Sequence, residues 1–298
     1  MLTIALHKDE SVFAYLSGAQ KGIKSIKKTG LYYPDFAFDR PFIAEQSSKT
    51  LLSKMFKEIL NDLSLKEEDI YFSFPADMTY INVYDDVKEE DIKTVANKDI
   101  WLSEQKFGKE VISSSDCQVK VVYKTNGSAR LIPIYFSKNI LDIVNFACTE
   151  NNCTLVGLGI NIFNASGLVK KITDESEYFL LSYEAGQYEL VDMQEGSMRS
   201  YVRFSAINNK AFYYLKSGKV SEELCEAVIQ KNSEILNKYR IFMTGTSGSL
   251  EHIQELIQCA PDIVVLNPMS INSAYSKPTL EYDRKYNTVF SSALGALI

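Results

Sequence analysis

The sequence is poor in the residues that build metal sites and disulfide frameworks. Its 298 residues include one tryptophan, two histidines and five cysteines, and no Cys-x-x-Cys pair occurs. His7 and His252 cannot complete a zinc site at these spacings. An odd number of scattered cysteines predicts reduced, mostly buried thiols in a reducing compartment. These cysteines are Cys117, Cys148, Cys153, Cys225 and Cys259.

Motifs of the common nucleotide-binding and hydrolase folds are also missing. There is no Gly-Lys-Ser or Gly-Lys-Thr loop, no Gly-x-Gly-x-x-Gly and no Gly-x-Ser-x-Gly. A net charge of -6 and a pI near 5.2 argue against a general nucleic-acid binder. No run approaches the ~20 apolar residues of a membrane span, and residues 1–8 do not resemble a signal peptide. We therefore expect a soluble cytoplasmic protein without direct membrane insertion.

What the sequence does contain is a repeated order of elements, in which a strand–turn–strand unit precedes alternating helices and strands. Apolar periodicity predicts strands in the first half at 2–6, 12–16, 21–27, 69–74, 81–84, 117–123, 129–136 and 154–158. It predicts helices there at 47–63, 87–107, 137–151 and 161–169, and an irregular segment at 31–44. The second half is predicted to hold a hairpin at 178–196, strands at 200–206, 240–243 and 263–266, and helices at 210–217, 222–236, 250–259 and 287–298.

This order predicts two α/β domains that face a cleft. At 46% hydrophobic and 23% charged residues, the chain has the composition and length for two ordinary domains. The single tryptophan, Trp101, lies in the predicted helix 87–107 beside Ile92, Val95 and Ile100. We interpret it as a core anchor and not as a ligand platform.

The order of elements resembles the actin-like ATPase superfamily. Within it the likeness is greatest to the PilM family of type IV pilus assembly and to the cytoplasmic domain of the secretion protein GspL. Four stretches carry it: 4–16, 70–107 with Ile-Trp-Leu-Ser-Glu at 100–104, the hairpin 178–196, and 241–245 with the closing residues 292–296. The resemblance implies an actin-like (ribonuclease H-like) fold with a first domain at 1–158, a small insertion subdomain at about 78–115, and a second domain at 159–298.

The resemblance also implies two Asp-containing turns that hold a metal and cradle phosphates with backbone amides. In the first turn, Leu6, His7 and Lys8 stand where the family carries Asp and Gly, and Asp9 is displaced towards the next strand. Asp9 and Ser11 remain candidates for contact with a phosphate. A solvated turn residue is the simpler interpretation of Asp9.

The second turn, within the hairpin 178–196, departs further from the family pattern. When Gly196 is matched to the glycine that closes the second strand, Ser182 stands in place of Asp, Glu184 in place of Gly and Tyr188 in place of Thr. A carboxylate at position 184 would oppose phosphate binding by like charge. The hairpin therefore keeps the shape of a phosphate clamp and loses its chemistry.

A third site, which seats adenosine in the superfamily, is better preserved. Gly245, Thr246, Ser247 and Gly248 follow a strand and precede a helix, as in a loop whose backbone approaches a ligand. Such a loop is weak evidence, because strand-to-helix turns also use glycine for geometry alone. These four residues complete the set of nucleotide-binding candidates, and no catalytic or metal-binding residue is predicted.

Two functions follow from the resemblance. The first is a non-catalytic actin-like scaffold, a pseudo-ATPase that binds an inner-membrane assembly protein through a short peptide near residues 81–107, without cofactor. The alternative is an active ATPase or small-molecule kinase that binds ATP with magnesium through divergent loops. The missing carboxylates in both turns favour the scaffold.

Overall fold

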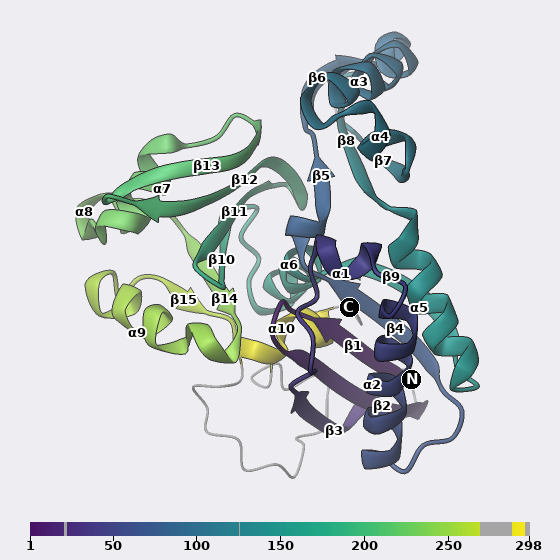
Figure 1. The fold of residues 1–298 in the computed structure, drawn as a ribbon. Helices are drawn as coiled ribbons and strands as arrows, with labels where there is room; N and C mark the ends of the chain where they lie inside the picture. The colour runs from purple at the N-terminus through teal and green to yellow at the C-terminus, as the bar shows by residue number, and fades with distance from the viewer. Residues whose placement is uncertain (21–22, 125, 269–287, 296–298) are drawn as a thin grey trace.

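The protein is built on three β-sheets, as seen in a computed structural model that describes residues 1–20, 23–124, 126–268 and 288–295 (Figure 1). The first sheet has the order β3-β2-β1-β4-β9. Its strands are β1 (Leu2–Leu6), β2 (Ser11–Gln20), β3 (Ile23–Tyr32), β4 (Asp69–Phe74) and β9 (Thr154–Ile160). β1 pairs antiparallel with β2 and parallel with β4. The end of β1 therefore lies in the middle of the sheet, beside the end of β4.

The second sheet repeats this arrangement with a hairpin beside a parallel strand. Its order is β13-β12-β11-β10-β14-β15, and β10 pairs antiparallel with β11 and parallel with β14. Its strands are β10 (Glu177–Glu184), β11 (Gln187–Gln194), β12 (Ser197–Ile207), β13 (Lys210–Gly218), β14 (Ile241–Gly245) and β15 (Val264–Val265).

The third sheet stands above the first in Figure 1 and carries two helices. It consists of β5 (Thr79–Ile81), β6 (Tyr84–Lys88), β7 (Ser115–Tyr123) and β8 (Ser128–Ser137), and its helices are α3 (Ile92–Phe107) and α4 (Lys109–Ser113). We call residues 79–137 the β5–β8 unit. It contains most of the region predicted as an insertion subdomain.

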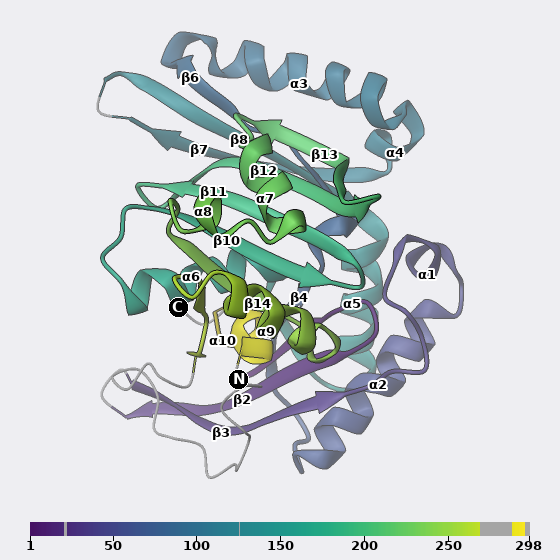
Figure 2. The same cartoon turned by 90° about the vertical axis from the view of Figure 1, so that its left-hand side faces the viewer.

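The remaining helices cover the faces of the first two sheets. They are α1 (Arg40–Ala44), α2 (Ser48–Asp62), α5 (Lys138–Glu150), α6 (Asn161–Ile172), α7 (Glu222–Gln230), α8 (Ser233–Leu236), α9 (Leu250–Cys259) and α10 (Ser291–Gly295). Short 3-10 turns are η1 (Ala76–Met78), η3 (Ser247–Ser249) and, within the β5–β8 unit, η2 (Glu89–Asp91). α7, α8 and α9 lie on the outer side of the second sheet (Figure 2). α10 packs against α6, β1 and β2.

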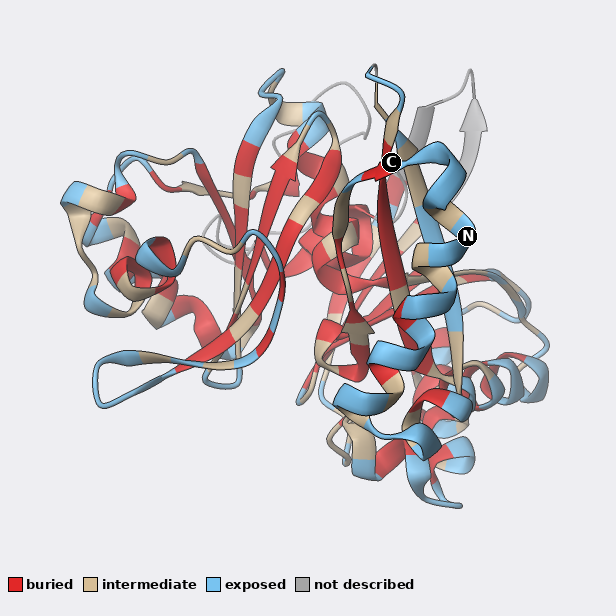
Figure 3. Ribbon diagram, turned by 90° about the horizontal axis from the view of Figure 1, so that it is seen from above, coloured by how far each residue is buried: buried red, intermediate tan, exposed pale blue. Residues whose placement is uncertain are grey.

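The core follows from the apolar periodicity of these elements. α2 turns Leu52, Met55 and Phe56 onto the first sheet, where the ring of Phe56 lies 6.0 Å from that of Phe72. The same cluster continues through α6 to Tyr178 on the near face of the second sheet, and the buried residues run through both sheets (Figure 3). Burial of apolar area on this scale is the main force holding the two sheets around α6.

Three predicted features were wrong. Residues 210–217 form β13 and not a helix, because exposed and covered side chains alternate along it with a period of two. Segment 31–44 is not wholly irregular, since Asp39 caps the short helix α1. Trp101 is not a core anchor, because 58% of it is exposed.

The helix that carries Trp101 buries a different face from the one predicted. Its two buried residues are polar, Asp99 and Ser103, while Ile100 and Leu102 are exposed. Asp99 accepts hydrogen bonds from three side chains beneath the helix: Asn82 (2.7 Å), Tyr84 (2.6 Å) and Tyr135 (2.5 Å). Residues 87–88 belong to β6, so α3 begins at Ile92.

Two further predictions are met in part. Cys148 and Cys225 are buried, but Cys117 and Cys259 are exposed. The closing helix exists at 291–295, whereas residues 287 and 296–298 of the predicted span lie outside the described residues.

Candidate functional site

Three turns meet between the first two sheets, and these are the turns that the sequence singled out. The β1–β2 turn spans residues 7–10, the β10–β11 turn spans 184–187, and the third follows β14 at 246–249. β10 and β14 are parallel neighbours, so the second and third turns leave the same edge of the sheet. The hairpin geometry is local, since Ala185 and Gly186 adopt the positive φ that a tight two-residue turn requires.

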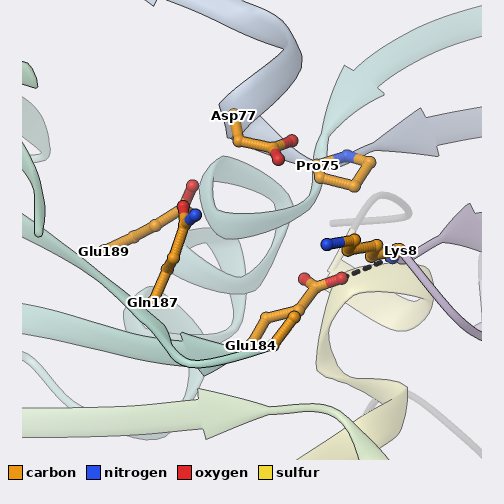
Figure 4. Close-up of a pocket in the computed structure, with 7 residues that line it drawn as sticks. Lys8, Pro75, Asp77, Glu184, Gln187 and Glu189 are labelled. Atoms are coloured by element: carbon orange, nitrogen blue, oxygen red, sulfur yellow. Dashed lines mark hydrogen bonds between the residues drawn. The ribbon is translucent and has the colours of Figure 1, made fainter. Parts of the chain in front are cut away.

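The first contact joins the two hairpins. The backbone N–H of Lys8 donates to Glu184 Oε1 at 2.5 Å, and His7 Nδ1 lies 2.9 Å from Glu184 Oε2. The other ring nitrogen of His7 lies 3.0 Å from the hydroxyl of Ser292 on α10. One carboxylate thus connects the two turns, as Figure 4 shows for the hydrogen bond between Glu184 and Lys8.

The electrostatics of this contact favour a charged pair. Burial alone would lower the pKa of His7, but the charge and hydrogen bond of Glu184 raise it above its ordinary value. Burial alone would raise the pKa of Glu184, but His7 and the amide of Lys8 lower it. Below the raised pKa of His7 the pair is an imidazolium and a carboxylate, with Nδ1–H of His7 as the donor.

A second carboxylate fills the third turn. The backbone N–H of Ser247 donates to Glu10 Oε1 at 2.9 Å, and the Ser247 hydroxyl donates to Glu10 Oε2. Glu10 is 4% exposed, so water competes little for these bonds. This turn lies just before α9, where free amides and the helix dipole attract an anion.

A backbone amide of the first turn and one of the third turn therefore each bind a carboxylate of the chain itself. Glu184 occupies the amide of the first turn, and Glu10 occupies that of the third. A phosphate could bind there only by displacing a buried, hydrogen-bonded carboxylate, and the two negative charges would repel it. The arrangement mimics a bound anion.

The cavity between the turns is small and acidic. It measures about 40 Å³ and is lined by Lys8, Pro75, Asp77, Glu184, Ala185, Gln187 and Glu189 (Figure 4). Burial, followed by the charge of Asp77, raises the pKa of Glu189 to about 8, and burial also raises the pKa of Asp77. Ligand pockets usually measure about 300 Å³ or more, so this space suits water and not a nucleotide.

The predicted binding residues fall into different surroundings. Asp9 is exposed at the tip of its turn, and Ser11 is fully buried on β2. A side chain at Gly245 would lie 2.3 Å from Ser249 Oγ and 2.9 Å from the carbonyl of Tyr183, so packing alone explains this glycine. Ser247 does approach the first turn, through Glu10.

The remaining candidates add no ligand contact of their own. Thr246 is 7% exposed, and its carbonyl accepts from Ser249. A side chain at Gly248 would meet nothing within 4 Å. In the hairpin, Tyr188 fills the core and its hydroxyl lies 2.6 Å from His252 Nε2.

Sequence reasoning found Glu184 but missed His7 and Glu10. His7 was considered as a zinc ligand and as one of the residues that stand where the family carries Asp and Gly, and Glu10 was not singled out. Glu184 stands out because it replaces a glycine of the family pattern, whereas no such departure marks Glu10. Contact between residues 177 positions apart is not visible from spacing.

Two further findings concern metal ligands and membrane-spanning helices. Within the described residues, no group of three or more His, Cys, Asp or Glu side chains could hold a metal ion. In the same part of the chain, no helix combines the length and the apolar character needed to cross a bilayer.

The fold agrees closely with one solved structure. The structure of the PilM-PilN type IV pilus biogenesis complex superposes with a TM-score of 0.69 at 13% identity, over 99% of this chain and 97% of that one. The chain has the actin-like ATPase fold. No family model matches the sequence, and no curated protein matches it.

Two other solved structures are more distant in shape. The cytoplasmic domain of EpsL, an inner-membrane component of the type II secretion system of Vibrio cholerae, gives a TM-score of 0.48 at 8% identity, covering 98% of this chain and 94% of that one. A Bacteroides thetaiotaomicron protein of actin-like ATPase fold and unknown function gives 0.46 at 13% identity, with coverages of 92% and 91%.

Proposed function

We propose that this chain is a non-catalytic actin-like scaffold, a pseudo-ATPase that binds a partner protein in the assembly of a pilus or secretion complex. The observation that carries the proposal is the occupation of both amide sites by Glu184 and Glu10. An ATPase keeps the amides of these turns free for its nucleotide, with a metal held beside the phosphates. Here Glu184 joins the first two turns directly, through Lys8 and His7.

The surface supports partner binding through the β5–β8 unit. Of the eleven exposed large apolar side chains among the described residues, five lie in this unit, which contains only residues 79–137. Three of them, Ile100, Trp101 and Leu102, lie on α3. Concentrated apolar exposure marks interaction surfaces, and aromatic residues carry much of their binding energy.

The likeness to the PilM-PilN complex over nearly the whole chain supports the choice of assembly system. By this proposal the protein works in the cytoplasm and reaches the inner membrane through a short segment of an assembly protein that binds near residues 81–107. No cofactor is required. The alternative, an active ATPase or kinase with rebuilt loops, predicts nucleotide turnover.

Two measurements test the proposal. Phosphate release from ATP with magnesium should equal the buffer background, and turnover above it would establish the alternative. Crosslinking in the native host, followed by mass spectrometry, should recover an inner-membrane assembly protein with the wild type and with Phe146→Ala, a change at an exposed ring on α5. Trp101→Ala should lose that protein. Equal recovery with Trp101→Ala would refute the placement of the partner on α3.

A further inference from the structure

The strand β7 (Ser115–Tyr123) is an unprotected sheet edge. It pairs with β8 along its whole length without a register shift, and no other strand pairs with it among the described residues. It contains neither proline nor glycine, and Val119 and Tyr123 are 41% and 65% exposed. Natural proteins blunt long edges of this kind, because free backbone groups recruit another strand.

The hydrogen bonds to β8 show which backbone groups of β7 are free. The N–H of Lys124 donates to the carbonyl of Ser128 at 2.8 Å, which makes these two residues a hydrogen-bonded pair. In an antiparallel ladder such pairs alternate, so the even-numbered residues of β7 bond to β8. The odd-numbered residues therefore direct N–H and C=O towards the free edge. They are Ser115, Cys117, Val119, Val121 and Tyr123.

The side chains of β7 are self-complementary about Gln118. Asp116 lies two residues before Gln118 and Lys120 two residues after it. In an antiparallel pair of two β7 strands with the two-fold axis at Gln118, Asp116 of each copy stands opposite Lys120 of the other. Cys117 then stands opposite Val119, and these odd-numbered residues are the ones with free backbone groups.

Neighbouring registers are poorer. Shifting the axis to Val119 places Lys120 opposite Gln118, and shifting it to Lys120 places two lysines together. Registers centred between residues would pair an outward-facing backbone group with an inward-facing one. Within β7, only the axis at Gln118 gives two cross-strand ion pairs, and among the described residues neither Asp116 nor Lys120 forms an ion pair.

We propose that two copies of this chain form a symmetric dimer by antiparallel pairing of their β7 strands about Gln118. The interface joins the third sheet of one copy to the third sheet of the other, so that they form one continuous sheet. It also places the exposed Val119 side chains of both copies on the same face of that sheet. Cross-strand charge pairs set the register, and the backbone ladder supplies the contact. This inference does not depend on the absence of catalysis.

Charge reversal tests the pairing by sedimentation equilibrium of the full chain. Asp116→Lys and Lys120→Asp should each weaken dimerisation about tenfold or more, because each replaces two attractive pairs with two repulsive ones. The double variant D116K/K120D should restore it. Lys57→Asp, at an exposed lysine on α2, makes the same charge change as Lys120→Asp at a distant site and should not affect dimerisation.

A cysteine at the axis tests the register. In a C117S/Q118C variant the two introduced thiols face each other in a non-hydrogen-bonded pair, about 4.5 Å apart at Cα, within reach of a disulfide. Mild oxidation should give a covalent dimer. The wild type, with Cys117 opposite Val119, should not crosslink at this strand. Circular dichroism checks that each variant is folded.

The proposal is overturned if the wild type remains monomeric up to about 0.3 mM, a concentration at which even weak specific pairing is detectable. It is also overturned if the single charge variants dimerise like the wild type, or if D116K/K120D fails to recover. Absence of the C117S/Q118C crosslink in a dimeric sample would refute the register.

Discussion

Glu184 in the cleft and Asp99 under α3 are both buried carboxylates, but they do different work. Glu184 joins two turns from different sheets, and with Glu10 it accepts hydrogen bonds from backbone amides of the first and third turns. Asp99 fixes a helix to its own sheet and allows that helix to display Trp101 and Ile100 outward. The polar groups of the cleft are therefore paired with one another, whereas the β5–β8 unit exposes apolar side chains that can bind a partner.

The largest expected effect comes from Asp99→Ala. The change removes the acceptor of three side-chain donors beneath α3, and unpaired buried donors are expensive. We expect a loss of about 4 kcal/mol in the free energy of unfolding, measured by chemical denaturation. A loss under about 1 kcal/mol would contradict the view that this polar network fastens the helix.

The next effect concerns the contact between the hairpins. Glu184→Ala should cost about 2 kcal/mol near pH 5.5, because His7 and the amide of Lys8 lose their shared acceptor. Glu177→Ala, on the same strand but exposed, should cost little. Equal losses for the two variants would contradict the role given to Glu184.

The pH dependence of this loss follows from the two pKa shifts. The lowered pKa of Glu184 gives stability above about pH 4.5 that is lost as the pH falls through the folded pKa. The raised pKa of His7 gives stability below about pH 6.5 that is lost as the pH rises through its folded pKa. The difference between wild type and Glu184→Ala should therefore peak between these values.

Glu189→Gln should have a smaller effect of the opposite sign. Glu189 keeps its proton up to about pH 8 in the folded chain, whereas an unfolded glutamate loses it near 4.5. Wild-type stability should fall as the pH rises between these values, and the variant should escape that fall. We expect Glu189→Gln to be more stable than the wild type at pH 9 and similar to it at pH 4. Thermal unfolding at both values checks this.

The smallest effect is expected for Trp101→Ala. Because the indole is mostly exposed, the change should alter stability by no more than about 0.5 kcal/mol. A core tryptophan would cost about 3–5 kcal/mol. A loss in that range would mean that α3 buries Trp101, which would contradict the exposed apolar surface assigned to the β5–β8 unit.

Much of the fold was predictable because its strong periodic segments are also its buried ones. The helix at 47–63 and the strands at 2–6 and 69–74 carry clear apolar patterns, and each lies within about one residue of its predicted place. The hairpin 178–196 was recognisable from two apolar strands around Ala185 and Gly186. Segment 210–217 was not recognisable as a strand, because its run of aromatic residues fits both the helical and the strand periodicity. Only the alternation of exposed and covered side chains in the structure distinguishes the two.

The candidate site was predictable only where a residue departs from a known pattern. Glu184 was singled out for that reason, and its carboxylate does stand against the backbone amides. His7 and Glu10 could not be placed, since their roles arise from contacts with residues 184 and 247, far along the chain. Trp101 was misplaced because burial was inferred from residue type, while the polar partners of Asp99 come from other strands.

The central claim is that Glu184 and Glu10 occupy backbone amides that a nucleotide would need, and calorimetric titration with ATP and magnesium tests it most directly. We expect no heat of binding for the wild type at millimolar nucleotide, a concentration at which binding with a Kd of about 1 mM would be detected. Saturable, magnesium-dependent binding to the wild type would contradict it.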